Sequence, residues 1–345
     1  MNDMKKGFLS CLLLSSLLPV MAQQKATLVR EEMVMDKPPV PAAHASTMTE
    51  LADGRLMMAW FGGSRESAKD VCIYTAIYAK GRWSAPVVVA DGVVNDSTRY
   101  AAWNPVLYTN KKGELLLFYK VGPNPREWWG VMKTSKNNGK TWSKALPLPD
   151  SILGPIRNKP VLLSNGLLLH PSSTESLDEK VWNVHVEFSD IYGKNWKRVN
   201  VNCDTFGVIQ PTILFHPGNK LQMLCRSRQN AIVESWSVDN GLTWSPLRKQ
   251  DMLNPNSGID AVTLKSGVHV LIYNPAVSGK DWSDGRNELR VGVSKDGEHW
   301  EDVYELEKHP KGEFSYPAVI EGKNGEIHIS YTYDRKNIKH VVIRL

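Results

Sequence analysis

The chain has 345 residues with a formal net charge of +6 at pH 7, and 42% of its residues are hydrophobic. Its basic residues are scattered and form no patch with interleaved aromatic residues, which excludes a typical nucleic-acid-binding surface. No Pro/Ser-rich or charged low-complexity stretch divides the chain, and a single all-β domain of this length is ordinary.

The first 22 residues have the features of an export signal. Lys5 and Lys6 precede an apolar run over residues 8–20, and small residues lead up to Ala22. We therefore expect cleavage after Ala22, a mature single domain over residues 23–345, and a periplasmic or secreted location. No later segment is long enough to span a bilayer.

After this leader, short apolar strands alternate with turns that are rich in Gly, Asn and Asp. Each repeat unit is expected to open with a pair of strands. In chain order these pairs are His44 to Leu51 with Arg55 to Phe61, Asn104 to Tyr108 with Glu114 to Tyr119, Lys159 to Leu163 with Leu167 to His170, Pro211 to Phe215 with Lys220 to Cys225, Ile259 to Leu264 with Val268 to Tyr273, and Pro317 to Ile320 with Glu326 to Thr332. Six such pairs predict six repeat units.

A turn motif follows four of these pairs, and it consists of a Ser, a turn containing Gly, and a Trp. The motifs end at Trp142, Trp196, Trp244 and Trp300, so the Trp residues lie 54, 48 and 56 positions apart. Hairpin-rich sequence with a period of about 50 residues is typical of blades stacked around an axis. We therefore predict an all-β fold, a six-bladed β-propeller.

The last unit has only one further strand, Ile338 to Ile343, and no turn motif. We expect residues around Thr27 to Met35 to supply its outer strand. This N-terminal strand would close the last blade and remove an exposed sheet edge.

Polar residues that the scaffold does not need occur where inner strands begin and where their neighbours end. These positions meet at one end of the axis, because the two strands are antiparallel and joined by a turn. Strand starts contribute His44, Trp103, Asn104, Asn158, Gln210, Asp260 and Tyr316, whereas strand ends and the loops after them contribute Arg65, Glu66, Asp70, Lys120, Glu175, Arg226, Arg228, Asn274, Arg286 and Arg335. We expect one pocket there for a small molecule or a chain end.

The third turn motif, residues 237–244, reads Ser-Val-Asp-Asn-Gly-Leu-Thr-Trp and matches the pattern Ser-x-Asp-x-Gly-x-Thr-Trp in full. It resembles the Asp box, or BNR repeat, of sialidases and related propeller glycosidases. Residues such as Asp239 and Trp244 are expected to hold turns together and to take no part in catalysis. Across residues 25–345 the blade order and boxes are similar to those of the bacterial exo-sialidases, which release terminal N-acylneuraminic acid.

This resemblance implies roles for several residues. Arg226 and Arg286 match two of the three arginines with which sialidases clamp the substrate carboxylate. Tyr316 stands where the nucleophilic Tyr is expected. Asp70, with Glu66 as the alternative, lies in the first-blade loop that carries the acid/base.

Two positions depart from the sialidase pattern. Where sialidases have Arg-Ile-Pro at the first inner strand, this chain has His44-Ala-Ser, and where they have Glu before Pro at the fourth, it has Gln210. An amide cannot take the proton of a Tyr hydroxyl. Glu313, close in sequence to Tyr316, is the candidate to assist that residue instead.

These observations predict an exo-acting glycoside hydrolase that removes a terminal acidic sugar, such as a sialic acid, another keto-acid or a uronic acid. Two alternatives stay open, a lyase in which His44 removes the proton beside a uronate carboxylate, and a non-catalytic carbohydrate-binding propeller. The expected partner is an acidic glycan or oligosaccharide, without a cofactor, a metal, nucleic acid or stable membrane insertion. Expected substrate-binding residues are Arg226, Arg286, Gln210, Asn104, Asn158, Glu66, Asp260 and Arg228, and the expected catalytic residues are Asp70, Tyr316, Glu313 and His44.

Overall fold

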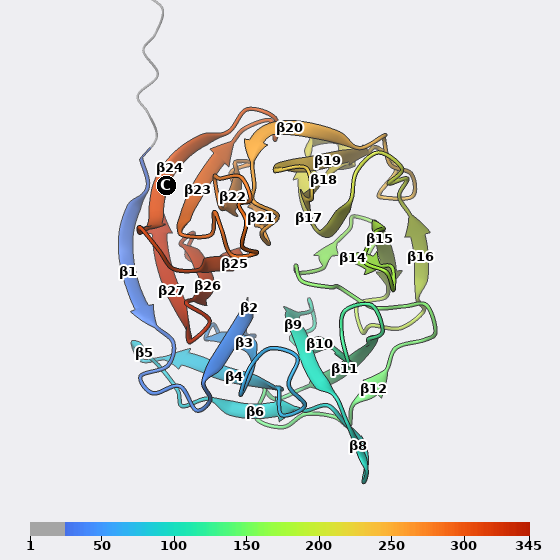
Figure 1. Ribbon diagram of the computed structural model, residues 1–345, viewed down its shortest axis with the longest axis vertical. Helices are drawn as coiled ribbons and strands as arrows, with labels where there is room; N and C mark the ends of the chain where they lie inside the picture. Colours follow the sequence, from blue (N-terminus) through green and yellow to red (C-terminus); the bar gives the residue numbers. More distant parts are fainter. Residues whose placement is uncertain (1–24) are drawn as a thin grey trace, which may run out of the picture.

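A computed structural model describes residues 25–345, whose strands form six sheets arranged around a central axis (Figure 1). The prediction of an all-β, six-bladed β-propeller is confirmed. The expected export signal lies outside the described residues. Within residues 25–345, no helix has the length and apolar character needed to cross a membrane.

The blades follow one another along the chain, each starting from the strand nearest the axis. The first blade contains β2 (Ala42–Glu50), β3 (Leu56–Gly63), β4 (Cys72–Ala79), β5 (Arg82–Trp83) and β6 (Val87–Ala90). The second contains β9 (Ala101–Thr109), β10 (Leu115–Gly122), β11 (Trp129–Ser135) and β12 (Leu146–Pro147). The third contains β13 (Val161–Leu162), β14 (Leu168–Glu175), β15 (Trp182–Ser189) and β16 (Lys197–Asn200). The fourth contains β17 (Val208–His216), β18 (Lys220–Ser227), β19 (Ala231–Ser237) and β20 (Arg248–Leu253), with the short 3-10 helix η1 (Pro217–Asn219) between its first two strands. The fifth contains β21 (Asp260–Thr263), β22 (His269–Tyr273), β23 (Glu288–Ser294) and β24 (Glu301–Lys308). The sixth contains β25 (Phe314–Glu321), β26 (Ile327–Tyr333), β27 (Asn337–Arg344) and β1 (Thr27–Met33). A small hairpin of β7 (Val93–Asn95) and β8 (Thr98–Arg99) projects from the ring between the first two blades.

The sixth blade is closed by the N-terminal strand. β1 pairs antiparallel with β27, and Glu32 lies opposite His340 in the register. The Glu32 Oε1 atom is 3.1 Å from His340 Nδ1. The expected closure is therefore confirmed, and it covers the edge that β27 would otherwise expose.

The Asp-box turns join the third strand of a blade to its outermost strand. In the third box, the Ser237 hydroxyl donates to Asp239 Oδ1 (2.8 Å) and accepts the backbone N–H of Gly241 (2.9 Å). Asp239 Oδ1 also accepts the N–H of Thr243 (2.9 Å), and the indole N–H of Trp244 donates to the Gly241 carbonyl (3.0 Å). Every polar group of the motif is used inside the turn, which is the structural role that the pattern predicts.

The hydrophobic core lies between blades. Phe61 of the first blade packs with Trp103, Leu107 and Tyr119 of the second, and all four side chains are buried. The indole N–H of Trp103 donates to the Gly122 carbonyl at 2.9 Å. Close-packed interiors of this kind deform little, so the strand starts around the axis are held in a fixed geometry.

Candidate active site

Four inner strands contain the same irregularity close to their first residues. The pairing register of β2, β9, β17 and β25 breaks there, and one residue at each break has a positive φ: Ala45 (53°), Asn104 (40°), Gln210 (54°) and Tyr316 (52°). A bulge bends a strand and redirects its side chains. Non-glycine residues adopt this conformation at a cost of about 1–3 kcal/mol, so the repetition marks a constrained site.

Arg226, near the end of β18, connects two of these bulges. Its Nη1 atom donates to the Tyr316 hydroxyl at 2.9 Å and to Gln210 Oε1 at 3.3 Å, and its Nε atom donates to Asn256 Oδ1 at 2.9 Å. The side chain is buried, and no carboxylate of residues 25–345 forms an ion pair with it. A buried cation held only by neutral groups is well suited to receive an anion.

Glu313 holds two further arginines on the other side of the site. Its Oε1 atom accepts from Arg286 Nη1 (3.1 Å) and from the Ser315 hydroxyl (2.8 Å), and its Oε2 atom accepts from Arg335 Nε (2.6 Å). Arg335, in the turn between β26 and β27, also forms an ion pair with Glu66. Both oxygens of Glu313 are thus occupied by neighbours other than the Tyr316 hydroxyl, so this carboxylate positions arginines.

Tyr316 lies at the centre of these cations. The guanidinium carbons of Arg157, Arg226 and Arg286 are 5.4, 5.8 and 5.9 Å from the centre of its ring. Burial raises the pKa of the phenol, but the positive charges of Arg226 and Arg286 outweigh it, and the pKa lies below its ordinary value near 10. The arginines therefore make Tyr316 ionise more easily than an ordinary tyrosine.

Arg157 was not among the residues predicted from the sequence. It precedes Asn158 at the start of the third inner segment, so the positional rule that selected Asn158 would have found it one residue earlier. Its guanidinium is buried, Nη1 donates to Asn158 Oδ1 (3.1 Å), and Nη2 donates to the Pro317 carbonyl. Burial lowers the pKa of this guanidinium to about 10, so it is charged at neutral pH.

His44 contacts Tyr316 from the first blade, with the ring centres 4.2 Å apart. Its Nδ1 atom is 2.9 Å from the Thr332 hydroxyl, which also accepts the backbone N–H of Ala45 at 3.1 Å. The other ring nitrogen, Nε2, is buried and has no hydrogen-bond partner among residues 25–345. Burial, followed by the charges of nearby arginines, lowers the pKa of His44 well below its ordinary value of 6.5, so the ring is neutral.

The first-blade loop carries both candidate acids. Asp70 accepts from the backbone N–H of Ser64 (2.9 Å) and from its hydroxyl (3.0 Å), whereas Glu66 is paired with Arg335. Neither carboxylate forms a hydrogen bond with Tyr316 in the part of the chain that the structure describes. The loop thus brings Glu66 to the arginine cluster and leaves Asp70 exposed.

Two predicted substrate-binding residues form hydrogen bonds within the protein scaffold. Asp260 accepts from Lys159 Nζ with both oxygens, at 2.9 and 2.8 Å, and also accepts the Val319 backbone N–H at 2.9 Å. Asn158 Nδ2 donates to the carbonyl of Gln210 at 3.1 Å. Asn158 therefore links the third and fourth blades, and Asp260 links the fifth blade to the third and the sixth.

Two tryptophans flank the arginines. The guanidinium carbons of Arg228 and Arg226 lie 3.9 and 5.7 Å from the Trp182 ring, and that of Arg335 lies 4.4 Å from the Trp282 ring. Trp282 is 62% exposed. The predicted residue Arg228 thus belongs to the rim, whereas Asn104 is a buried bulge residue of β9.

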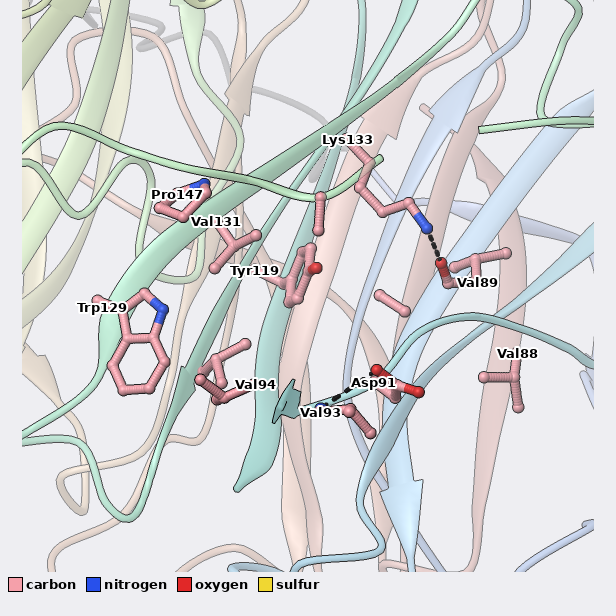
Figure 2. A pocket seen from close by; sticks show the side chains of 13 residues that line it. Val88, Val89, Asp91, Val93, Val94, Tyr119, Trp129, Val131, Lys133 and Pro147 are labelled. Carbon is pink, nitrogen blue, oxygen red and sulfur yellow. Dashed lines mark hydrogen bonds between the residues drawn. The ribbon is translucent and has the colours of Figure 1, made fainter. Parts of the chain in front are cut away.

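A small cavity lies near the axis, and a wider groove lies between two blades. A cavity of about 130 Å³ beside the arginine cluster is lined by His44, Glu66 and Arg335. A wider groove of about 460 Å³ lies between the first two blades, where valines face Tyr119 and Trp129 (Figure 2). The charged side chains lining that groove are Asp91 and Lys133, and Lys133 donates to a backbone carbonyl at 2.6 Å. The convergent charged groups are at the axis, which makes the axis the candidate active site.

Comparison with known families gives a match over most of the chain. Residues 54–329 match the sequence profile of the BNR repeat-like domain. The chain is also similar to the anhydrosialidase of the leech Macrobdella decora, with 25% identity over 232 residues that cover 58% of this chain and 29% of the leech protein. The chain therefore spans under a third of that relative.

Solved structures share the same architecture. A protein of unknown function from Dyadobacter fermentans superposes with a TM-score of 0.75 and 15% identity, covering 93% of this chain and 99% of that one. The NanB sialidase from Streptococcus pneumoniae superposes with a TM-score of 0.67 and 14% identity, covering 93% of this chain and 70% of that one. The expected likeness to sialidase-like Asp-box propellers is thus confirmed at the level of the fold.

Proposed function

Since this chain belongs to the BNR repeat-like domain family, we propose that it is an exo-acting glycoside hydrolase that removes a terminal acidic sugar from glycans. One observation carries the proposal: Arg226, Arg286 and Arg335 converge on Tyr316 at the axial end of the propeller. The sialidase-like relatives agree with this class of activity.

The substrate class follows from the charge at the site. Arg226 has no carboxylate partner among residues 25–345, so a ligand carboxylate is the anion it lacks. The planar guanidinium forms paired hydrogen bonds to a carboxylate, which a lysine ammonium does not. A sialic acid, another keto-acid sugar or a uronic acid carries such a group, and the faces of Trp182 and Trp282 suit the neighbouring sugar rings.

In the hydrolytic mechanism, the Tyr316 oxygen attacks the anomeric carbon and forms a C–O bond while the glycosidic bond breaks. Asp70, the acid that the sialidase resemblance implies, gives its proton to the leaving oxygen. Water then replaces the Tyr316 oxygen and returns a proton to the carboxylate. Glu66 and Glu175 are the other carboxyl groups near the arginines, and burial raises the pKa of Glu175, which favours its protonated form.

A second candidate activity is favoured by the contact between His44 and Tyr316. With a uronate carboxylate on Arg226, the Tyr316 oxygen takes the proton beside that carboxylate. The electron pair left behind forms a carbon–carbon double bond and expels the glycosidic oxygen, which takes up a proton. From the sequence, His44 is expected to be the base in such a lyase. Burial lowers the pKa of His44 and makes the imidazole a weak base, so we assign that role to Tyr316, with His44 as its neighbour.

The experiment incubates residues 23–345 with sialyllactose, Kdo-containing oligosaccharides and oligosaccharides that end in rhamnosyl-glucuronate. Product mass and the ultraviolet absorbance of an unsaturated uronate are followed together. Release of an intact acidic sugar without new absorbance supports the hydrolase, and an unsaturated product supports the lyase. Binding without turnover across the panel contradicts both and supports a carbohydrate-binding propeller.

We also propose that the protein is exported, because residues 1–22 have the features of a signal peptide. Expression of the full chain in a bacterial host, followed by N-terminal sequencing of the protein from the periplasm or the medium, tests this. The expected mature N-terminus is Gln23. Retention of Met1 in the cytoplasmic fraction would contradict it.

A further inference from the structure

The Tyr316 hydroxyl receives a hydrogen bond but gives none. Arg226 Nη1 donates to its oxygen at 2.9 Å, and no acceptor of residues 25–345 lies within hydrogen-bonding distance of the phenol proton. The Tyr316 side chain is only partly buried, so solvent water is the group that can take the phenol proton. A phenolate oxygen would accept the Arg226 hydrogen bond with a full negative charge, which makes that hydrogen bond stronger.

Gln210, which shares the Arg226 guanidinium with Tyr316, is unsuited to take the proton. Gln210 Oε1 lies 3.3 Å from Arg226 Nη1 and receives a hydrogen bond from it. An amide oxygen accepts a hydrogen bond, but it does not become protonated near neutral pH. Gln210 therefore does not act as a base for Tyr316.

Several blades contribute charged groups around Tyr316. The cations are Arg157 before β13, Arg226 on β18, Arg286 before β23 and Arg335 after β26; the anions are Glu66 after β3 and Glu313 before β25, and the imidazole of His44 on β2 is neutral. Asp260 and Glu175 are further carboxyl groups near Arg157 and Arg226. Glu313 and Glu66 are engaged by Arg286 and Arg335, and Asp260 is paired with Lys159, so Arg157 and Arg226 form no ion pair with a carboxylate of residues 25–345.

Arg157 is the most enclosed of these cations. Its hydrogen-bond partners are the neutral oxygens of Asn158 and Pro317, and its Nε atom is buried without a partner among residues 25–345. Its guanidinium carbon lies over the Tyr316 ring, 5.4 Å from the ring centre. Burying an unpaired cation is costly, and a negative charge on the adjacent ring offsets that cost.

We propose that Tyr316 is a phenolate in the resting protein, with Arg226 as the hydrogen-bond donor to its oxygen and Arg157 as the counter-charge over its ring. The hydroxyl proton passes to solvent water before substrate binds, so no helper base is needed at position 210. Arg157 is a positioning residue in this scheme, since it acts through Tyr316. The inference deepens the proposed function by specifying how Tyr316 is activated, but the ionisation itself can be measured without a substrate.

The experiment records the near-ultraviolet absorbance of tyrosinate as a function of pH for residues 23–345 and for Tyr316→Phe. The difference between the two chains reports Tyr316 alone. We expect that difference to show a tyrosinate at neutral pH. In Arg157→Gln, which retains a donor for the Pro317 carbonyl but loses the charge, the midpoint should rise by about two pH units.

Two further variants distinguish a change in the titration midpoint of Tyr316 from a general disturbance of the fold. Arg157→Lys retains a cation in the core and should raise the midpoint less than Arg157→Gln. Arg198→Met removes an arginine from β16 that contacts Asn200 and the Ser151 carbonyl, outside the site, and should leave the midpoint unchanged. Circular dichroism and the melting temperature establish which variants fold.

Either of two results overturns the proposal: no tyrosinate difference between the parent chain and Tyr316→Phe at neutral pH, or a folded Arg157 variant whose midpoint equals that of the parent. If Arg157→Gln does not fold, Arg157→Lys supplies the second comparison. These outcomes are distinct from failure of the proposed function, because a chain that cleaves no glycan in the panel still shows or lacks the Tyr316 phenolate.

Discussion

The outer turns and the axial site are both built from polar residues, but only the outer turns satisfy those residues locally. In the fourth Asp box, Asp296 accepts from the Ser294 hydroxyl (3.0 Å) and from the backbone N–H of His299 (2.8 Å), both within the same turn. At the axis, Arg226 and Arg157 have no carboxylate partner among the described residues. A polar group that is satisfied by its own turn stabilises the fold, whereas a buried charge that lacks a partner marks a place for a ligand or an ionised side chain.

The backbone shows the same contrast. In the third Asp box, the positive φ angles belong to Asn240 (59°) and Gly241 (84°), residue types that adopt this conformation readily. At the axis they belong to Asn104 and also to Ala45, Gln210 and Tyr316, three residue types that adopt it less readily. The bulges that direct side chains into the site therefore carry more backbone strain than this turn.

The change with the largest expected effect is Tyr316→Phe at the axis. Removal of one oxygen abolishes both proposed reactions, because each uses that oxygen as nucleophile or base. We expect turnover of the active substrate to fall by about three orders of magnitude or more, with little change in melting temperature. Steady-state kinetics and thermal melts measure the two effects, and a variant with undiminished turnover would remove Tyr316 from the mechanism.

Arg226→Met should have the next largest effect. It removes the cation that contacts Tyr316 and that we expect to bind the substrate carboxylate, so kcat/KM should fall about 100-fold, with a rise in KM. Arg198→Met on β16 is the matched control and should retain the parental constants. A product inhibitor that carries the carboxylate should bind the Arg226→Met variant correspondingly more weakly in calorimetry.

Much of the fold was predictable because its signals are local. A turn needs Ser, Asp or Asn, Gly and Trp at fixed spacing, and that spacing is visible in the sequence at Trp142, Trp196, Trp244 and Trp300. The closure by β1 followed from the missing outer strand of the last unit. Repetition made each of these local signals stronger.

The site was predictable only in part, because its contacts join distant segments. Arg226 and Tyr316 were selected from the sequence, but their hydrogen bond spans 90 positions. Arg335 was expected at the pocket, but its hydrogen bond to Glu313 could not be predicted from the sequence. Arg157 was missed because an arginine before an inner strand carries no local sign of burial. Which charges are paired with which is set by blade packing, which sequence spacing does not report.

A change in an outer turn should lower stability and leave catalysis unchanged, whereas a change at the axis should lower catalysis and leave stability nearly unchanged. Asp239→Ala removes a carboxylate that accepts from the Ser237 hydroxyl and from both the backbone and the hydroxyl of Thr243. We expect a loss of about 1–2 kcal/mol in unfolding free energy and unchanged kcat/KM, since the turn lies far from Tyr316 in the blade. Denaturant titration and kinetics provide the test, and impaired catalysis in a stably folded variant would contradict the division between turn and axis.

The smallest expected effect is the pH response of the fourth Asp box. Burial raises the pKa of Asp296, but hydrogen bonds from His299 and Ser294 outweigh it and lower the pKa from 3.8 to about 2. Because the pKa is lower in the folded chain than in the unfolded chain, the carboxylate contributes stability above pH 4, and this contribution is lost as the pH falls from about 4 to 2. Asp296→Asn should therefore lower the melting temperature slightly at neutral pH and lose less between pH 4 and pH 2 than the parent. Since the turn is largely exposed, the difference in melting temperature should also shrink with added salt. If that difference stays constant from pH 4 to pH 2, Asp296 acts through its shape and not through its charge.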